Sequence, residues 1–206
     1  MSATQAPLFL QRLLRLGLQA QDDEELRLGK TLLNLGSLLF VLAALVWLGA
    51  CKAIDPGFPV AAAVTVPALA LVNLALFAGH RWFAPYRFVQ LGLLLAFPVV
   101  TQLGIGALPG TSGLALWGLL APAAALLSGR VAGSTWWFAG FLLGTALSAS
   151  LPPPGGEPGA FVALHIALVS SVLYLQLRYA QGRRGRTREK LADAHHQLRL
   201  EKERSE

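Results

Sequence analysis

The sequence predicts an all-α, polytopic membrane protein. It would be a bundle of six transmembrane helices with both termini in the cytoplasm, flanked by an N-terminal amphipathic helix and a C-terminal cytoplasmic helix. Hydrophobic residues make up 54% of the 206 residues and charged residues only 14%, whereas soluble domains carry about 25% charged residues. The apolar residues gather in six runs of the ~20 residues that cross hydrocarbon. The basic residues gather on one side of that arrangement, as the positive-inside rule requires.

Residues 1–21 are expected to form an amphipathic helix on the membrane surface. Within 7–19, leucines fall on one side of a helix, and glutamines and arginines fall on the other. The segment is too short to span a bilayer, and its basic side suits anionic headgroups. Asp22 and Glu25 have the spacing of a capping box. A second helix is therefore expected to start there and to continue into the first span.

The membrane domain is predicted to extend over 22–180. Turn-forming residues, mostly Pro, Gly and Asp, separate its apolar runs. Because the connections are short, consecutive spans are expected to be antiparallel neighbours in a compact bundle. The predicted spans are 31–51, 58–79, 87–108, 112–129, 133–151 and 159–179.

The distribution of lysine and arginine predicts the orientation. With six spans and the N-terminus in the cytoplasm, sixteen of the 17 Lys and Arg residues fall on the cytoplasmic side, and Lys52 alone falls outside. An odd number of spans would break this pattern. The net charge of +6 is therefore a signal of topology, and nucleic acid is not an expected partner.

The middle of every predicted span lacks Asp, Glu, Lys and Arg. Ion pumps and proton-coupled transporters usually keep such a residue, because a charge at that depth costs several kcal/mol. Transport is therefore disfavoured. The milder polar residues of the spans are expected to form interhelical hydrogen bonds. They are Asn34, Asn73, Gln90, Thr101, Gln102, His165, Ser170 and Ser171.

Two residues suggest an alternative function as an enzyme. Ser112 lies in a Gly-Thr-Ser-Gly run that opens the fourth span, and His165 lies about two turns into the sixth. This pair resembles the dyad of rhomboid intramembrane serine proteases, in which a histidine takes the serine's proton. The connection over 52–57 is much shorter than the loop of that family, and Asn73 alone could supply its oxyanion-hole group. Structurally, Ser112 would instead cap a helix and His165 would bond within the bundle.

Asp55, Glu157 and His165 are weak candidates for a divalent-cation site on the outer side. Hard cations take six or more oxygen ligands, and three groups spread over separate segments fall well short of that number. No metal or other cofactor is therefore expected in this chain.

Gly140 and Gly144 form a small-xxx-small pattern in the fifth predicted span. Such a pattern allows two helix backbones to approach closely. The partner helix could belong to the same subunit or to the second subunit of a dimer, and the sequence favours neither.

Residues 181–206 are expected to form a cytoplasmic helix that starts a coiled coil. Leu191 and Leu198 lie seven residues apart, which is the spacing of a coiled-coil seam. Fewer than three such heptads are present, so the seam would support a dimer only if it continued. Gly182 and Gly185 each weaken the helix by roughly 1 kcal/mol relative to Ala.

Four runs of the sequence resemble the six-helix membrane anchors of bacterial class III adenylate/guanylate cyclases. They are 24–33 (EELRLGKTLL), 86–92 (YRFVQLG), 116–122 (LWGLLAP) and 200–206 (LEKERSE). The last run resembles the signalling helix that precedes the catalytic domain in that family. The resemblance covers the chain from about residue 22 to its end.

The resemblance implies a membrane anchor and receptor domain that forms a homodimer in the bacterial inner membrane. It would pass conformational change to a C-terminal cyclase domain, which in the family uses two Mg or Mn ions held by paired aspartates to make cAMP or cGMP. This chain is expected to stop inside the signalling helix, before those residues, and so not to be an enzyme itself. Related anchors serve histidine kinases and diguanylate cyclases, which remain an alternative. The resemblance identifies no ligand.

Overall fold

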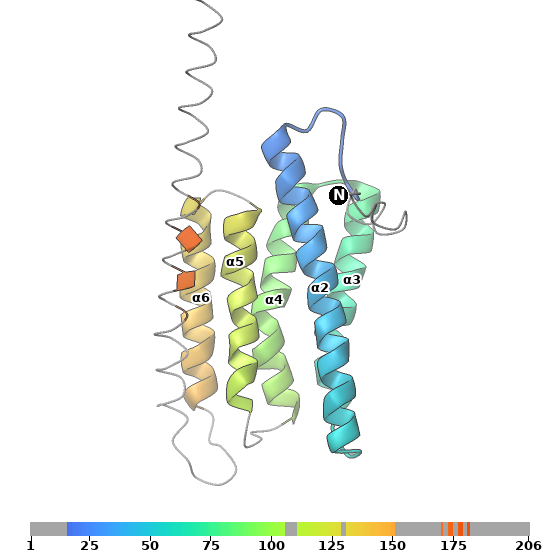
Figure 1. The fold of residues 1–206 in the computed structure, drawn as a ribbon, viewed down its shortest axis with the longest axis vertical. Coiled ribbons are helices and arrows are strands. Elements are labelled where there is room, and N and C mark those ends of the chain that lie inside the picture. Colours follow the sequence, from blue (N-terminus) through green and yellow to red (C-terminus); the bar gives the residue numbers. More distant parts are fainter. Residues whose placement is uncertain are drawn as a thin grey trace, which may run out of the picture.

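The computed structural model describes residues 16–105, 111–128 and 131–150, together with six residues in or just after the last predicted span. Those six are Ser170, Leu173, Tyr174, Leu177, Arg178 and Gln181, all helical. Throughout this described part the regular secondary structure is helical, with no strand. The elements are α2 (Glu24–Ile54), α3 (Val60–His80), α4 (Phe83–Ile105), the 3-10 helix η1 (Thr111–Leu119), α5 (Leu120–Leu127) and α6 (Val131–Ser150) (Figure 1).

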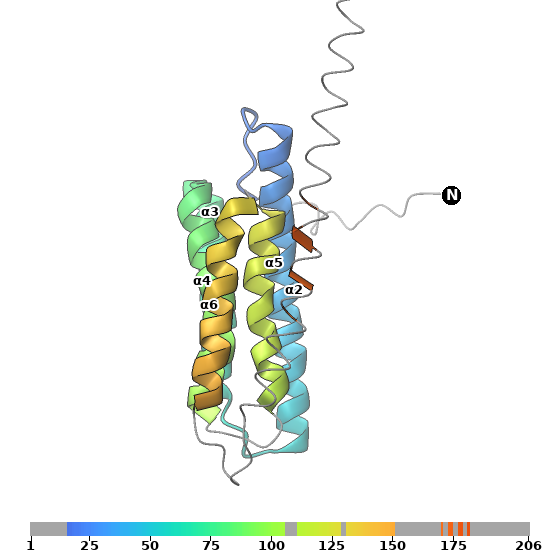
Figure 2. The same cartoon turned by 90° about the vertical axis from the view of Figure 1, so that its left-hand side faces the viewer.

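The helices run up and down along one common direction (Figure 1). Helix η1 continues into α5 in the same direction, and otherwise each helix is antiparallel to the next. The end where α2, α4 and α6 begin, and where α3 and α5 finish, is called the entry end below. Seen from the side, α3, α4 and α6 form one layer, and α2 and α5 form the other (Figure 2). Helix α4 is central, because it contacts α2, α3, η1, α5 and α6.

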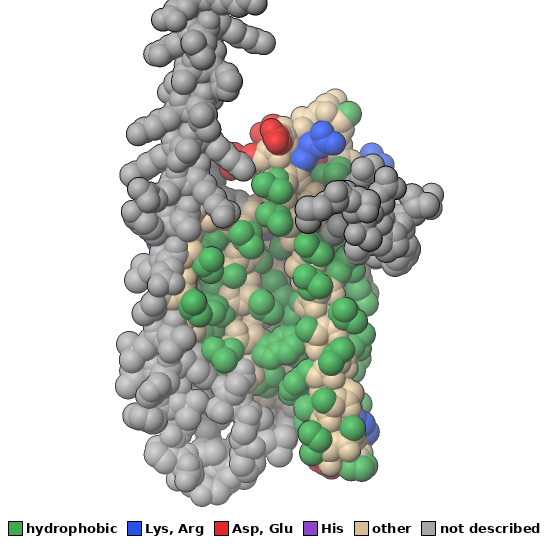
Figure 3. All heavy atoms as spheres, viewed as in Figure 1, with side chains coloured by type: hydrophobic (Ala, Val, Ile, Leu, Met, Phe, Trp, Pro, Cys, Tyr) green, Lys and Arg blue, Asp and Glu red, His purple; other side chains and the backbone are tan. Residues whose placement is uncertain are grey.

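Among the described residues, three helices are long and apolar enough to cross a membrane: Glu24–Ile54, Val60–His80 and the stretch Phe83–Gly104 of α4. Their outward side chains are apolar as well, and many large hydrophobic residues of α2 and α3 are exposed. On the face shown in Figure 3, apolar side chains cover the visible part of the described helices, and Lys, Arg, Asp and Glu appear only towards the two ends. An exterior of this kind fits contact with lipid tails rather than with water.

The N-terminus of α2 corrects two predictions. Asp23, and not Asp22, caps the helix, because its carboxylate accepts a hydrogen bond of 2.7 Å from the Leu26 N–H. The amphipathic helix predicted over 1–21 does not reach its expected end, since residues 16–21 form turns and Gly17 adopts a left-handed φ of 71°. Residues 1–15 lie outside the described part.

The fourth predicted span is not one α-helix over 112–129. It consists of η1 followed by α5. Pro122 cannot donate a backbone hydrogen bond, and its ring crowds the carbonyl four residues earlier, so it disfavours an α-helix continuing through Gly118. A 3-10 helix rises about 2.0 Å per residue against about 1.5 Å for an α-helix. These seventeen residues therefore reach about 30 Å, which is the thickness of a hydrocarbon core.

The other predicted boundaries differ by a few residues. Helix α2 starts seven residues before the predicted span, at Glu24, because its charged first turns continue the same helix beyond the apolar run. Helix α4 starts at Phe83 rather than at residue 87, since Pro85 is tolerated in a first helical turn. Most of the span predicted over 159–179 lies outside the described residues.

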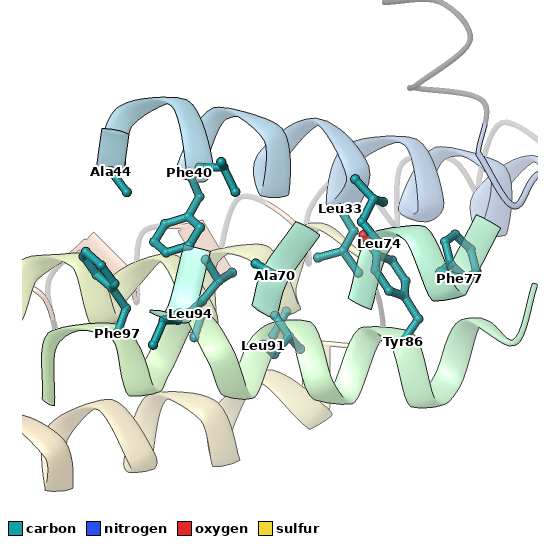
Figure 4. Packing of buried hydrophobic residues seen from close by; sticks show 14 of the residues in the cluster. Leu33, Phe40, Ala44, Ala70, Leu74, Phe77, Tyr86, Leu91, Leu94 and Phe97 are labelled. Atoms are coloured by element: carbon teal, nitrogen blue, oxygen red, sulfur yellow. The ribbon is translucent and has the colours of Figure 1, made fainter. Parts of the chain in front are cut away.

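The core lies between α2, α3 and α4, with its side chains interleaved as Figure 4 shows. Phe40 of α2 meets Phe97 of α4 edge-on, with ring centroids 5.1 Å apart. Trp117 of η1 joins them, its ring centroid 5.2 Å from that of Phe97. Such pairs add about 0.5–1.5 kcal/mol each beyond the burial of area. Within lipid, where apolar burial drives little association, close packing of this kind holds helices together.

Candidate functional site

Lys30, in the second turn of α2, is buried at the entry end with 2% of its surface exposed. Its ammonium group lies 2.8 Å from both carboxylate oxygens of Asp22 and 3.0 Å from the Gly17 carbonyl oxygen. It also lies 6.0 Å from the centre of the Phe83 ring. An ammonium group has three N–H donors, and these acceptors use all of them. Lys30 thus fastens the segment that precedes α2.

Asp22 completes the ion pair from a side chain that is 5% exposed. Its carboxylate also accepts a hydrogen bond of 2.7 Å from the Gln19 N–H. Burial alone would raise the pKa of Asp22. The hydrogen bonds from Lys30 and Gln19, with the charges of Lys30 and Arg27, outweigh burial and hold the pKa below its ordinary value. The Asp22 carboxyl is therefore ionised at neutral pH.

Asn34 lies one turn beyond Lys30 and bonds in two directions. Its amide N–H donates to the Leu16 carbonyl at 3.0 Å, and its carbonyl oxygen accepts from the Tyr86 hydroxyl at 3.0 Å. The Tyr86 hydroxyl also lies 3.5 Å from Ser37 Oγ. Asn34 thus connects the segment before α2 to the central helix α4.

Gly17 of the segment before α2 packs closely against the aromatic ring of Phe77. A Cβ atom at Gly17 would sit 2.2 Å from the nearest carbon of Phe77 in α3. Phe77 in turn stacks on Tyr86, with ring centroids 4.1 Å apart. Only glycine combines this contact with a positive φ. Residues 16–23, called the entry segment below, are therefore bound directly to α2 and α3, and Asn34 and Phe77 link them to Tyr86 of α4.

A second polar layer lies deeper, between α3 and α4. The Asn73 amide donates to the Tyr86 carbonyl at 3.1 Å and to the Gln90 side-chain oxygen at 2.9 Å. Gln90 is fully buried, and its amide nitrogen has no hydrogen-bond partner among the described residues. The interhelical hydrogen bonds predicted for Asn34, Asn73 and Gln90 are thus present. Thr101 and Ser170 find no partner for their hydroxyl groups within the described part.

Arg87 of α4 ties the end of α5 to the same region. Its guanidinium donates to Ser128 Oγ and to the Ala125 carbonyl, each at 3.2 Å. A cation there satisfies carbonyl groups that have no partner within the helix, and it opposes the negative end of the helix dipole. Gly29 of α2 lies against the Ser128 carbonyl, which a Cβ atom would approach to 3.1 Å.

The last described residues of the chain contact α6 near the entry end. The Tyr174 hydroxyl lies 2.7 Å from Ser134 Oγ, and its ring stacks on Phe138 with centroids 4.2 Å apart and planes at 1°. One turn later, Arg178 donates to Thr135 Oγ1 at 2.8 Å. These five residues are called the exit latch below.

The residues of the predicted protease dyad are not brought together within the described part. Ser112 lies in η1, but its side chain is outside the described structure, and so is His165. For the predicted cation site, Glu157 and His165 lie outside, and Asp55 caps a turn by accepting from the Gly57 N–H at 2.8 Å. The described residues contain no group of three or more His, Cys, Asp or Glu able to hold a metal ion.

Gly140 and Gly144 face α4 of the same chain. A Cβ atom at Gly140 would lie 3.0 Å from the Leu95 side chain, and one at Gly144 would lie 3.8 Å from that of Val99. The two glycines thus line a contact within the subunit. The other predicted dimer residues, Leu191 and Leu198, lie outside the described part.

The sequence interpretation missed the role of Lys30, which it treated only as a marker of orientation. The signal was present in the spacing, because Lys30, Asn34 and Ser37 recur at intervals of four and three and so share one face of α2. Lys30 bonds to Asp22 and to a backbone carbonyl, and Asn34 and Ser37 both lie within hydrogen-bond distance of the Tyr86 hydroxyl. This network therefore holds helices and the entry segment in place. Comparisons with protein-family models, curated proteins and solved structures find no match.

Proposed function

We propose that this chain is the membrane anchor and receptor domain of a bacterial class III nucleotide cyclase. It would span the inner membrane six times, form a homodimer, and hold two cyclase domains together on the cytoplasmic side. The catalytic domain that would follow it would supply the Mg or Mn site. The resemblance of runs 24–33, 86–92, 116–122 and 200–206 to such anchors is the basis of the assignment.

The structural observation that carries the proposal is the position of the two ends of the membrane domain. The entry segment is fastened to Lys30 at the entry end, and Arg178 of the last helix contacts Thr135 near the start of α6, at the same end. A chain that enters and leaves a membrane on the same side crosses that membrane an even number of times. This arrangement supports an anchor that presents an output domain on the side where it began.

The charges support a cytoplasmic entry end. Arg27, Lys30, Arg81, Arg87 and Arg178 all lie towards it, whereas Lys52 lies near the opposite end of α2. The positive-inside rule places the richer side in the cytoplasm. The two exposed tryptophans near that end, Trp82 and Trp136, suit the headgroup region.

A fusion protein tests the proposal. The chain is joined at Glu206 to a class III catalytic domain that is active only as a dimer, and cAMP is measured in bacteria that lack their own cyclase. Output is expected to exceed that of the same domain on a monomeric single-span anchor by about tenfold or more, because dimerisation raises the effective concentration of the second domain. Equal output from the two anchors would contradict the proposal.

A further inference from the structure

The exit latch fixes the last helix in two ways at once. Tyr174 and Arg178 are four residues apart, so they lie on one face of the helix, one turn from each other. A single contact would leave the helix free to rotate about it, whereas two contacts at this spacing fix its rotation and its position along α6. Tyr174 is 3% exposed, so its ring and hydroxyl are held in a packed environment.

Helix α6, which carries three of the five residues of the exit latch, packs into the bundle through a second face. Gly140 and Gly144 lie against Leu95 and Val99 of α4. Phe141 is 1% exposed, and its ring would lie 3.0 Å from a Cβ atom at Gly118 of η1. Helix α6 therefore contacts α4 and η1 on one face and the last helix on another. A shift of either element against α6 has a direct physical path to the exit latch.

We infer that Tyr174 and Arg178 are positioning residues that set the rotation at which the last helix leaves the bundle, with α6 as the element that passes movements of α4 and η1 to it. The inference rests on the proposed function, in which the chain beyond Arg178 leads to the output domain. It identifies the contact through which the receptor domain controls that output.

Distance measurements test the latch in the full chain. Spin labels are placed at Gly133 and Gln181 in a Cys51→Ser background, reconstituted in liposomes and diluted with unlabelled chain so that pairs within one molecule dominate. A narrow distance distribution is expected, and the double variant Tyr174→Leu/Arg178→Ala is expected to broaden or shift it. Thr145→Ala is the matched control, because that hydroxyl bonds to the Phe141 carbonyl within α6. An unchanged distribution in the double variant would overturn the inference.

The fusion with the cyclase domain tests the functional part. The double variant is expected to change cAMP output by about fivefold or more, at an equal amount of dimer, while Tyr174→Phe with Arg178→Lys keeps the stack and the charge and restores part of the original output. A broadened distance distribution with unchanged cAMP output would overturn the role of these residues in transmission. An inactive unmodified fusion would count against the proposed function alone, since the distance measurement would still decide whether the latch exists.

Discussion

At the scale of single residues, the buried Lys30–Asp22 ion pair determines which substitutions at the entry end destabilise the protein. Both side chains are nearly inaccessible to solvent, at 2% and 5% exposed. A buried pair contributes modestly as a whole, because desolvation offsets the attraction between its charges. Removing one partner lowers the stability of the fold far more, since the remaining charge stays buried without compensation.

Lys30→Met is therefore expected to destabilise the protein by about 3–5 kcal/mol. The double variant Asp22→Leu/Lys30→Met should be less destabilised than Lys30→Met alone, because it leaves no buried charge. Unfolding in detergent micelles, followed by fluorescence of the five tryptophans, measures both. Equal stability of the single and double variants would show that the pair is solvated.

The ion pair also predicts a response to acid. The folded pKa of Asp22 lies below its ordinary value of 3.8, so the unfolded chain binds the proton more readily. The stability from the pair is then fully present above about pH 4 and is lost as the pH falls through the folded pKa. The stability difference between wild type and Asp22→Asn should narrow below about pH 4. A difference that stays constant down to pH 2.5 would contradict this assignment.

At the scale of elements, two glycines in neighbouring helices should respond oppositely to substitution. A Cβ atom at Gly118 of η1 would lie 3.0 Å from Phe141 and 3.4 Å from Pro98, whereas a Cβ atom at Gly92 of α4 would meet nothing within 4 Å. Gly118→Val is expected to destabilise the bundle by about 1–3 kcal/mol through overpacking. Gly92→Ala is expected to stabilise it by about 0.5–1 kcal/mol, because alanine favours the helix.

The same unfolding measurement compares the two variants directly. The substitution in η1 also acts on the contact that joins η1 to α6, so it should alter the distance between labels at Gly133 and Gln181. Stability that is unchanged by Gly118→Val would mean that η1 and α6 separate easily at this point.

At the scale of the whole molecule, the proposed orientation predicts which surfaces are accessible from outside the cell. Ile54, the last residue of α2, is 86% exposed, and Trp82, at the entry end, is 71% exposed. In a Cys51→Ser background, a cysteine at position 54 should react with a membrane-impermeant maleimide in intact cells. A cysteine at position 82 should react only after permeabilisation. The reverse pattern would contradict the orientation.

The helices themselves could be predicted from the sequence because an apolar run of about 20 residues has few alternatives in lipid, where backbone groups must bond within a helix. The apolar runs predict α3, α4 and α6 to within a few residues of their observed bounds. The capping residues predict the charged first turns of α2 before its apolar run, and the structure starts the helix at Glu24, one residue after its cap Asp23. The change from η1 to α5 was missed because hydropathy does not distinguish a 3-10 helix from an α-helix.

The entry network was only partly predictable. Asn34, Asn73 and Gln90 stand out as polar residues in apolar runs, and hydrogen bonding was expected of them. The partners of Lys30 depend on a turn at Gly17 that folds the chain back onto Phe77, and local sequence does not fix that path. Tyr86 was not singled out, because an aromatic residue near a span end is ordinary until Asn34 is placed beside its hydroxyl.

The 3-10 conformation of η1 makes the length of the fourth span adjustable. If its nine residues converted to an α-helix, the span would shorten by about 4–5 Å. That change is comparable to the difference in hydrophobic thickness between biological membranes. A thinner bilayer should therefore favour the α form and shift Gly118 along Phe141, so that hydrophobic mismatch would be expected to change the packing of η1 against α6.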